Sequence, residues 1–329
     1  MRITVLGGTR FIGFALLEDL HAAGHEITVV HRGITEPAGL PPCEHIHVGR
    51  DQLRGLTALR GADVLIDMHA MTAADSHALL DAVPEHVRLV VISSVDVYRA
   101  FGSLLRDQES DAVPLNEDSP VRTERYPYRD LAAREEGYDK LDVEDLFLPR
   151  GATILRLPMV YGERDAQRRE EHILRRVRAG RQRIPIGSAS WLPTRGYVRD
   201  IARGIRLAAE TPAAAGQVLN LCESTSYSTG AWAGLILEAA GSSAELVRVP
   251  DSRLPADLRE LGRLSQHLVM DSRRARELLG WRDSDHLSNL RASVAWHLQN
   301  PPPEASTDFT EDDAALAAGP VQSAGSSGG

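Results

Sequence analysis

The feature that most constrains this chain is a glycine-containing turn between an apolar strand pattern and an amphipathic helix pattern near its start. The segment 3–33 reads "ITVLGGTRFIGFALLEDLHAAGHEITVVHRG". Gly7 permits a tight turn after the strand, and Gly13 lets the helix approach the sheet closely. The first N–H groups and the positive dipole end of such a helix suit a pyrophosphate, so the segment predicts a dinucleotide-binding unit. The loop residues expected at the cofactor are Gly7, Thr9, Arg10, Phe11, Ile12 and Gly13.

Short apolar runs rich in β-branched residues alternate with helical patterns along the first half of the chain. This alternation predicts a parallel sheet covered on both faces, which is an α/β, doubly wound fold of the Rossmann type. Strands are expected at 3–6, 27–31, 45–48, 64–67, 89–93 and 153–157, and helices at 11–23, 52–60, 73–83 and about 131–147.

After residue 157 the alternation becomes less regular, and helices are expected near 168–179, 200–210, 229–240, 273–279 and 285–298. The run "VLNLC" at 218–222 predicts a strand that returns to the sheet. We therefore expect a dinucleotide-binding core at 1–157 and a smaller, interleaved substrate-binding lobe at 158–299. Residues 300–329 are rich in Pro, Gly, Ser and acidic residues, which predicts a disordered tail.

The overall composition indicates a soluble, cytoplasmic protein. The formal net charge of −9 opposes general binding of nucleic acid or of an anionic membrane. No stretch reaches the ~18 apolar residues that a membrane-spanning helix needs, and no leader pattern precedes the first strand. The two cysteines, Cys43 and Cys222, match no metal or disulfide framework, which favours a reducing compartment.

The end of the second predicted strand carries Arg32 and no acidic residue. An acidic side chain at this point binds the adenosine ribose in NAD-binding proteins and would repel a 2′-phosphate. A guanidinium pairs with phosphate through two hydrogen bonds, so Arg10 and Arg32 together predict NADP(H), with NAD as the second choice of cofactor. In the alternative interpretation both arginines are solvated surface charges.

Several motifs in order along the chain resemble those of one enzyme group. They are the loop at 7–13, "VVISSVDVY" at 90–98, "YDKLDVE" at 138–144, "LRLPMVYGERD" at 155–165 and "TRGYVRDIA" at 194–202. Together they resemble the extended short-chain dehydrogenase/reductase superfamily, which includes the NAD(P)-dependent epimerases and dehydratases, over residues 1–298. The Gly-Gly-Thr-Arg-Phe-Ile-Gly form of the loop is similar to that of an atypical subgroup, to which chloroplast stem-loop-binding proteins belong.

The resemblance implies an oxidoreductase-type site made of a tyrosine, a lysine four residues later and a hydroxyl residue. It assigns Ser94 as the hydroxyl residue and Lys140 as the lysine, and it also places Lys140 in contact with the cofactor. Counting back four residues from the lysine gives Glu136, whereas Tyr138 lies only two residues away. On a continuous helix Glu136 and Lys140 would share a face, and Tyr138 would point in nearly the opposite direction.

Three interpretations of this departure stay open. Glu136 is a carboxylate acid/base beside Lys140, or a tyrosine from elsewhere enters the site, or the redox step is lost. The tyrosines available for the second interpretation are Tyr98, Tyr126, Tyr128 and Tyr161. The plain structural alternatives are an i,i+4 surface ion pair between Glu136 and Lys140 and a capping hydroxyl at Ser94.

The resemblance also places an acid/base residue at Asp96, where nucleotide-sugar dehydratases of the family carry one. Those enzymes have a second acid one residue earlier, where this chain has Val95, so a standard sugar dehydratase is disfavoured. As an alternative, Asp96 caps a turn.

On the substrate side, the resemblance places Pro158 and Tyr161 in a loop along the nicotinamide and the substrate, and Arg195 at a sugar-nucleotide diphosphate. Arg164 and Arg263 are weaker candidates for an anion contact, and ordinary ion pairs are the alternative for all three arginines. The long insert at 99–130, which ends in "YPYR", predicts a lid or binding segment. The residues expected to contact substrate are therefore Tyr98, Tyr128, Tyr161, Arg164 and Arg195.

His45 and His47 alternate on a predicted strand and face the same way, but no third ligand is spaced with them, so no metal site is expected. The expected function is that of an NADP(H)-dependent epimerase or reductase acting on a nucleotide sugar or a related polar small molecule. A non-catalytic NADP-binding sensor or scaffold is the alternative, and RNA binding is less favoured. The expected partner is that small molecule, with no nucleic acid and no membrane. The family resemblance also implies pairing with a second copy in a homodimer, through the helices expected at 73–83 and 131–147.

Overall fold

Seven parallel strands form the central sheet of the structure, a computed structural model that describes residues 1–129, 136–259, 264–304 and 306–317. The strand order is β10-β6-β5-β4-β1-β2-β3, and every neighbouring pair is parallel. The predicted doubly wound α/β fold is therefore confirmed. The strands are β1 (Arg2–Leu6), β2 (Glu26–His31), β3 (Glu44–His47), β4 (Val64–Asp67), β5 (Arg88–Ser94), β6 (Thr153–Leu157) and β10 (Val218–Asn220).

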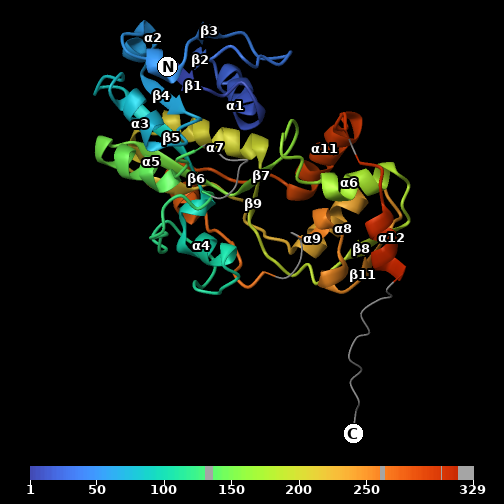
Figure 1. Cartoon of the computed structure of the whole chain (residues 1–329). Helices are drawn as coiled ribbons and strands as arrows, with labels where there is room; N and C mark the ends of the chain where they lie inside the picture. Colours follow the sequence, from blue (N-terminus) through green and yellow to red (C-terminus); the bar gives the residue numbers. More distant parts are fainter. Residues whose placement is uncertain (130–135, 260–263, 305, 318–329) are drawn as a thin grey trace.

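Helices cover both faces of this sheet (Figure 1). One face packs against α1 (Phe11–Ala22) and α7 (Val198–Glu210), and the other against α2 (Thr57–Gly61), α3 (Ala73–Leu80) and α5 (Lys140–Phe147). Successive strand residues point to opposite faces, so Val5 joins the core under α1, whereas Leu6 joins the core under α3 and α5. The apolar runs of the sequence are continuous because both faces are buried.

The order of the strands reverses at β1, which lies between β4 and β2. In open α/β sheets, ligands bind outside the carboxyl ends of the strands at such a switch point. The turn at Gly7 follows β1, Asp67 ends β4, and Arg32 follows β2. The residues predicted from the glycine loop and from the second strand therefore lie at one edge of the sheet.

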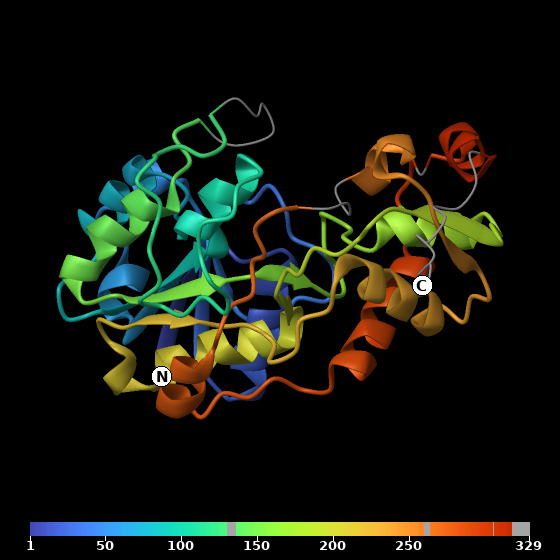
Figure 2. The ribbon, with the colours of Figure 1, turned by 90° about the horizontal axis from the view of Figure 1, so that it is seen from below.

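The second half of the chain builds a smaller lobe beside the sheet (Figure 2). Its elements include the parallel pairs β7 (Met159–Tyr161) with β9 (Arg195–Tyr197) and β8 (Arg183–Ile186) with β11 (Glu245–Arg248), and the helices α6 (Glu171–Arg178), α8 (Thr229–Ala239), α9 (Ala256–Arg259), α11 (His286–Gln299) and α12 (Thr310–Ala317). The chain crosses between the lobes, because β10 pairs with β6, and α10 (Arg273–Leu279) lies against β10 and α7. The strand expected near 218–222 thus returns to the sheet as β10.

Two predicted helices differ from the structure for local reasons. The helix expected at about 131–147 begins only at Lys140, because Gly137 has a positive φ of +76° and Asp139 caps the first turn. Residues 130–135 of that prediction lie outside the described part of the chain. The helix expected at 52–60 is divided into a 3₁₀ turn at Arg50–Gln52 and α2, since Gly55 between them has a φ of +88°. The insert expected as a loop contains α4 (Arg99–Leu105).

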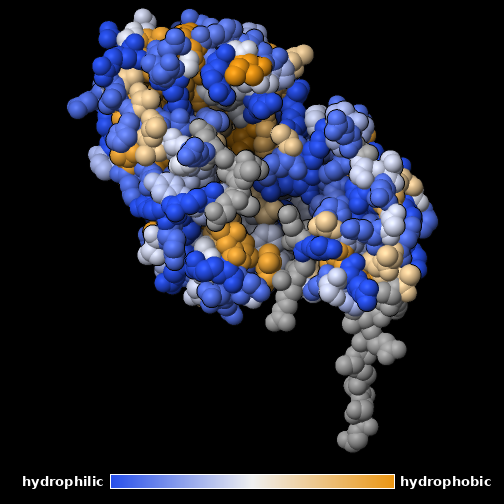
Figure 3. Space-filling view, in the orientation of Figure 1, coloured by the Kyte–Doolittle hydropathy of each residue, from blue (hydrophilic) through white to orange (hydrophobic). Residues whose placement is uncertain are grey.

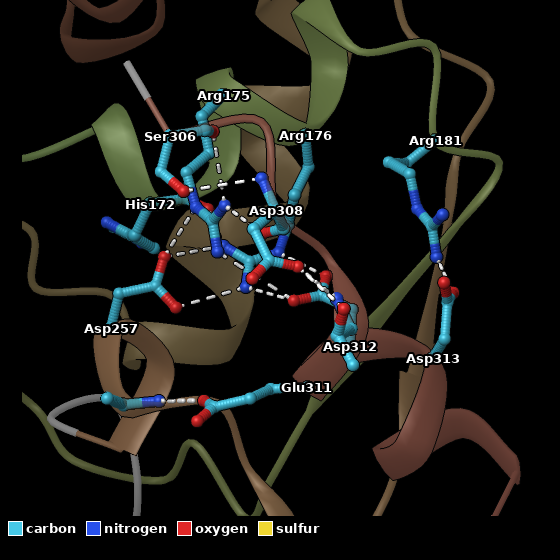
Figure 4. Close-up of polar contacts among 12 residues, drawn as sticks. His172, Arg175, Arg176, Arg181, Asp257, Ser306, Asp308, Glu311, Asp312 and Asp313 are labelled. Atoms are coloured by element: carbon cyan, nitrogen blue, oxygen red, sulfur yellow. Dashed lines mark hydrogen bonds and ion pairs between the residues drawn. The ribbon is translucent and has the colours of Figure 1, made fainter. Parts of the chain in front are cut away.

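The prediction of a disordered tail is wrong for the segment that forms α12. Its Asp312 accepts two hydrogen bonds of 2.7 Å from Arg176 of α6, whose side chain is fully buried (Figure 4). Arg176 also donates to Asp257 at 2.8 Å. Composition indicated disorder, but the acidic residues of this segment meet arginines of the smaller lobe and are ordered by them. Residues 318–329 lie outside the described part of the chain.

We expect Asp312→Ala to lower the free energy of unfolding by about 1–3 kcal/mol, because it leaves a buried guanidinium with fewer hydrogen bonds. The matched control is Asp313→Ala, whose partner Arg181 pairs with it at the surface (Figure 4). That change should lower the free energy by less than about 1 kcal/mol. Chemical denaturation of the full chain measures both, and equal effects would contradict the docking of α12 through Asp312.

Among the helices of the described residues, none has the combination of length and apolar character needed to cross a membrane.

Candidate active site

The glycine loop has the geometry that close approach to a phosphate requires. Gly7 has a φ of +81°, and a Cβ on Gly13 would lie 2.1 Å from the Cα of Gly8, so only glycine fits where α1 begins. Arg10 is extended and immediately precedes α1. The first N–H groups of a helix have no intrahelical partner and favour an anion. Thr9 is buried in this loop, and Phe11 and Ile12 are half-buried at the helix start, so the residues present fit a dinucleotide.

Arg10 and Arg32 lie at the carboxyl ends of adjacent strands, β1 and β2. Both side chains are exposed, and within the described part of the chain neither has a hydrogen-bond or ion-pair partner. Arg50, by contrast, lies at the same edge of the sheet and is paired, since it contacts Asp67 at 2.5 Å. Two unpaired guanidinium groups beside the glycine loop leave their donors open to an anionic ligand.

Lys140, the first residue of α5, is buried beneath the carboxyl end of β5. Its Nζ donates to the carbonyl oxygens of Ala70 (2.5 Å) and Ile92 (3.0 Å), and the residue is 3% exposed. Burial lowers the pKa of Lys140 to about 8, and the negative charges of Asp96 and Asp67 oppose that shift. The ammonium therefore stays charged at neutral pH but titrates well below an ordinary lysine.

Asp96 forms the centre of a buried polar cluster next to Lys140. Its Oδ2 accepts hydrogen bonds from the hydroxyl groups of Tyr138 (2.8 Å) and Tyr128 (3.2 Å), and the residue is 2% exposed. Burial raises the pKa of Asp96, while the Tyr138 hydrogen bond and the charges of Arg122 and Lys140 act in the opposite direction. Among the described residues, Asp96 Oδ1 has no hydrogen-bond partner. The Asp96 carboxylate thus accepts hydrogen bonds from two phenols through Oδ2, while Oδ1 has no partner among the described residues.

A buried ion pair fixes this cluster to the start of α5. Arg122 and Asp139 contact each other at 2.8 Å, and both side chains are almost fully buried. Asp139 also accepts from the N–H groups of Leu141 (2.9 Å) and Tyr126 (2.7 Å), and so caps the helix and fixes the insert. Arg122 Nε donates to the backbone carbonyl of Asp96. The pair therefore holds Asp96 and the tyrosine-bearing segments in one unit.

The structure changes the interpretation of the missing tyrosine. Because α5 begins at Lys140, Tyr138 precedes the helix, and the helical geometry that would point it away from Lys140 does not apply. Tyr138 lies in the buried cluster, with its ring centroid 6.0 Å from Lys140 Nζ. Glu136 is exposed on the turn before the helix. Tyr128 from the insert also joins this cluster. Ser94 Oγ accepts from the N–H of Asp96 at 3.3 Å.

Two of the residues expected on the substrate side, Tyr161 and Arg195, belong to a second polar cluster. Tyr161 donates to Glu223 at 2.8 Å, and the Arg195 guanidinium lies over the ring of Trp232 at 4.3 Å. Arg195 also donates to the carbonyl oxygen of Tyr227 at 3.2 Å. Burial lowers the pKa of Arg195 to about 10 and raises that of Glu223 to about 7. Arg195 and Tyr161 therefore pack together in the interior of the smaller lobe.

The remaining candidates lie apart. Tyr98 is fully buried and donates to Asn220 of β10 at 2.7 Å. Arg164 lies over the ring of Phe14 of α1, 3.9 Å from its centroid, and Pro158 is buried between β6 and β7. Arg263 lies outside the described residues.

Two clusters near the glycine loop were not anticipated from the sequence. Arg50 pairs with Asp67 at the end of β4 (2.5 Å) and with Asp75 (3.3 Å), at the same edge of the sheet as the glycine loop. His31 and Glu36 lie beside His45 and His47. No spacing rule connects residues on separate strands, helices and loops, and their meeting depends on the strand order. The surface between the two lobes is hollowed, and apolar side chains are visible within the hollow (Figure 3).

Comparison with known proteins identifies the family of the chain. Residues 3–222 match the model of the NAD dependent epimerase/dehydratase family. The chain is 25% identical over 337 residues to the chloroplast stem-loop binding protein of 41 kDa b from Arabidopsis thaliana, covering 96% of this chain and 84% of the relative. It is 27% identical over 268 residues to dTDP-glucose 4,6-dehydratase from Streptomyces griseus, covering 78% and 74%.

Among solved structures, the fold is similar to that of MoeE5 in complex with UDP-glucuronic acid and NAD, with a TM-score of 0.67, 20% identity, and coverage of 91% of this chain and 99% of the other. The UDP-glucose 4-epimerase from Thermotoga maritima gives a TM-score of 0.66 at 18% identity, covering 92% and 100%. At such identities the similarity establishes the fold. The family model, however, covers more than half of the chain, so this protein belongs to the NAD-dependent epimerase/dehydratase family, a family of oxidoreductase-type enzymes.

Proposed function

We propose that this protein is an NADP(H)-dependent epimerase or reductase that acts on a nucleotide sugar or a related polar small molecule. The observation that carries the proposal is the buried cluster of Asp96, Tyr138 and Lys140 at the carboxyl end of β5. Perturbed titratable groups that share one buried cluster next to a cofactor loop are typical of proton-transfer sites. The family match, together with relatives that act on sugar nucleotides, supports the substrate class.

The nicotinamide dinucleotide, when bound, accepts or donates the hydride of an alcohol–carbonyl interconversion. In our proposal Tyr138 gives its hydroxyl proton to Asp96, and the resulting phenolate takes the hydroxyl proton of the substrate as an alcohol is oxidised. In the reverse direction the Tyr138 phenol donates its proton as a carbonyl is reduced, and it recovers a proton from Asp96. The Lys140 ammonium stabilises the Tyr138 phenolate electrostatically. Asp96 holds the Tyr138 hydroxyl in place and exchanges a proton with it. Tyr128 supplies a second hydroxyl to the same carboxylate oxygen. Glu136 has no role in this scheme, because it is exposed on a turn.

The loop residues and the two arginines would hold the cofactor. The N–H groups of α1 would face the pyrophosphate, and Arg10 and Arg32 would contact a 2′-phosphate. MoeE5 is described with UDP-glucuronic acid and NAD, and the Thermotoga maritima epimerase with UDP-glucose, so UDP sugars and dTDP-glucose form a rational first panel. A change in nicotinamide absorbance with any of them supports the proposal.

Preference for NADP over NAD should depend on the two unpaired arginines. We expect Arg10→Ala and Arg32→Ala each to weaken NADP binding about tenfold or more, because each removes a charge-assisted hydrogen bond, and to change NAD binding much less. Calorimetry with both dinucleotides measures this. The control is Arg54→Ala, an exposed arginine that pairs only loosely with Asp81 at 4.0 Å. Unchanged NADP preference in both variants would end the assignment of the 2′-phosphate site.

Turnover should fall as the pH rises through about 8. Lys140 is charged below its lowered pKa of about 8 and neutral above it, so its stabilisation of the phenolate is present on the acidic side and lost on the alkaline side. A pH profile of kcat measures the falling limb. In Lys140→Arg the side chain stays charged, so any residual activity should persist to higher pH, and an identical limb in both proteins would contradict the role of Lys140.

A second candidate function, binding of an RNA stem-loop, takes its support from the name of the Arabidopsis relative. The net charge of −9 opposes it, since RNA binding depends on neutralising phosphates with basic residues. A salt-titrated RNA-binding assay distinguishes the candidates. NADP binding without any change in nicotinamide absorbance across the sugar-nucleotide panel would instead favour a non-catalytic sensor or scaffold.

A further inference from the structure

Three histidines and a glutamate meet at the edge of the sheet, outside the proposed active site. His31 ends β2, His45 and His47 belong to β3, and Glu36 lies on the loop between these strands. Because β2 and β3 are parallel and His31 pairs in register with His47, the three imidazoles gather on one side of the strand pair. One ligand atom from each of the four residues lies within 4.8 Å of all the others.

The spacing of these atoms is close to that of a tetrahedral coordination sphere. His31 Nε2 lies 2.9 Å from His45 Nδ1 and 3.5 Å from Glu36 Oε1, and His45 Nδ1 lies 4.0 Å from the same oxygen. His47 Nε2 also contacts this oxygen directly. Ligands ~2.1 Å from a zinc ion in tetrahedral geometry are about 3.4 Å apart, so small side-chain rotations would seat an ion between them.

The surroundings orient the rings for this arrangement. The second nitrogen of His45, Nε2, lies 3.3 Å from Cys43 Sγ, which directs Nδ1 toward the cluster. Contacts of this kind to the non-ligating nitrogen are usual around protein-bound metals. The side chain of His31 is 7% exposed, whereas those of His47 and Glu36 are 52% and 41% exposed, so an ion has a route in from the solvent.

From this geometry we infer a binding site for a divalent transition-metal cation of the zinc type, with His31, His45, His47 and Glu36 as its ligands. Three imidazoles and one carboxylate are a donor set that Zn²⁺ accepts readily in tetrahedral geometry, whereas Mg²⁺ and Ca²⁺ prefer oxygen ligands. The expectation that no metal site exists considered only His45 and His47, which lie on one strand. The third histidine and the carboxylate come from the neighbouring strand and from the loop.

The site would fix the edge of the sheet beside the cofactor loop. Arg32 directly follows His31, and the N–H of Gly33 lies 3.3 Å from His31 Nδ1. An ion on Nε2 places the ring proton on Nδ1, so this contact lengthens on binding. The cation therefore joins β2, β3 and the 32–43 loop, at some distance along the chain from the residues proposed for proton transfer.

The test uses the full chain, purified without a histidine tag, treated with a chelator, and titrated with Zn²⁺ in a calorimeter. We expect one ion per chain, and we expect His47→Gln and Glu36→Gln each to weaken its binding by at least about tenfold. These two side chains are the most exposed of the four, so their replacement should leave the fold intact. The control is His21→Gln, an exposed histidine on α1 that should leave the affinity unchanged.

Titration with Co²⁺ gives a second readout that does not depend on activity. Tetrahedral Co²⁺ has intense visible absorption, which we expect in the unmodified chain and in His21→Gln, and which His45→Gln should abolish. Failure of the unmodified chain to take up Zn²⁺ would overturn the inference. So would equal Zn²⁺ affinity in the unmodified chain, in H47Q and in E36Q, since both results would leave the four side chains without a role as ligands.

Discussion

Replacement of Tyr138 by Phe should lower kcat by about 10²–10⁴-fold on whichever sugar nucleotide proves to be the substrate. The change removes one hydroxyl, which donates to Asp96 at 2.8 Å, and leaves the ring that packs on Tyr128, with the two centroids 5.4 Å apart. The phenol is therefore lost with little loss of packing. NADP affinity should stay close to that of the unmodified protein, because the cofactor loop lies at a different strand end.

Two matched variants make this result specific. Tyr128→Phe removes the longer hydrogen bond to the same carboxylate (3.2 Å), so we expect a smaller loss of kcat than for Tyr138→Phe. Glu136→Gln alters an exposed side chain and should leave kcat within about twofold of the unmodified value. Stopped-flow measurement of nicotinamide absorbance at saturating NADP would follow all three. A large loss in Glu136→Gln with full activity in Tyr138→Phe would reverse the assignment of the proton donor.

The sequence predicted the sheet well because the relevant signal is local. Each strand at the centre of the sheet is a short apolar run, and both of its faces are buried, as Val5 and Leu6 illustrate. The glycine loop was equally predictable. A Cβ at Gly13 would collide with the backbone of Gly8, so the turn requires a glycine, and that requirement is visible in the sequence. Loop and strand patterns of this kind depend on neighbours a few residues away.

The helix before Lys140 shows where pattern reading failed although a signal was present. A glycine at 137 and an aspartate at 139 are the residues that interrupt and cap helices, and the acidic first turn after Lys140 is typical of a helix start. Giving those two residues more weight than the family spacing would have placed Tyr138 outside the helix. The error matters for the proposed function, because a continuous helix would point Tyr138 away from Lys140, whereas its ring is buried beside that lysine.

Other contacts, within the proposed site and outside it, could not be predicted, because they depend on distant segments of the chain. Tyr128 reaches Asp96 from 32 residues away, and Arg176 orders the C-terminal helix from 136 residues away. The histidine cluster needs the β2–β3 register to unite His31 with His47. A single sequence contains the residue types for these contacts but no measure of which distant pairs meet.

Replacement of Asp139 by Ala should lower the free energy of unfolding by about 3–5 kcal/mol, the usual range when one partner of a buried ion pair is removed. The change strands the almost fully buried Arg122 guanidinium and removes the cap of α5 as well as the acceptor for the Tyr126 N–H. Asp142→Ala is the matched control, because its partner Arg125 is 38% exposed and the pair should contribute less than about 1 kcal/mol.

Chemical denaturation in the absence of cofactor measures the free energy of unfolding of Asp139→Ala and of Asp142→Ala. The double variant Arg122→Met/Asp139→Leu adds a sharper test. Replacing both charges by apolar groups of similar size should recover much of the lost stability, because no buried charge is then left unpaired. Turnover should not recover, since Arg122 no longer donates to the Asp96 carbonyl and Asp139 no longer caps the start of α5 next to Tyr138. If the double variant recovered stability and activity together, the ion pair would support folding alone, and the positions of Asp96 and Tyr138 would have to be set by other contacts.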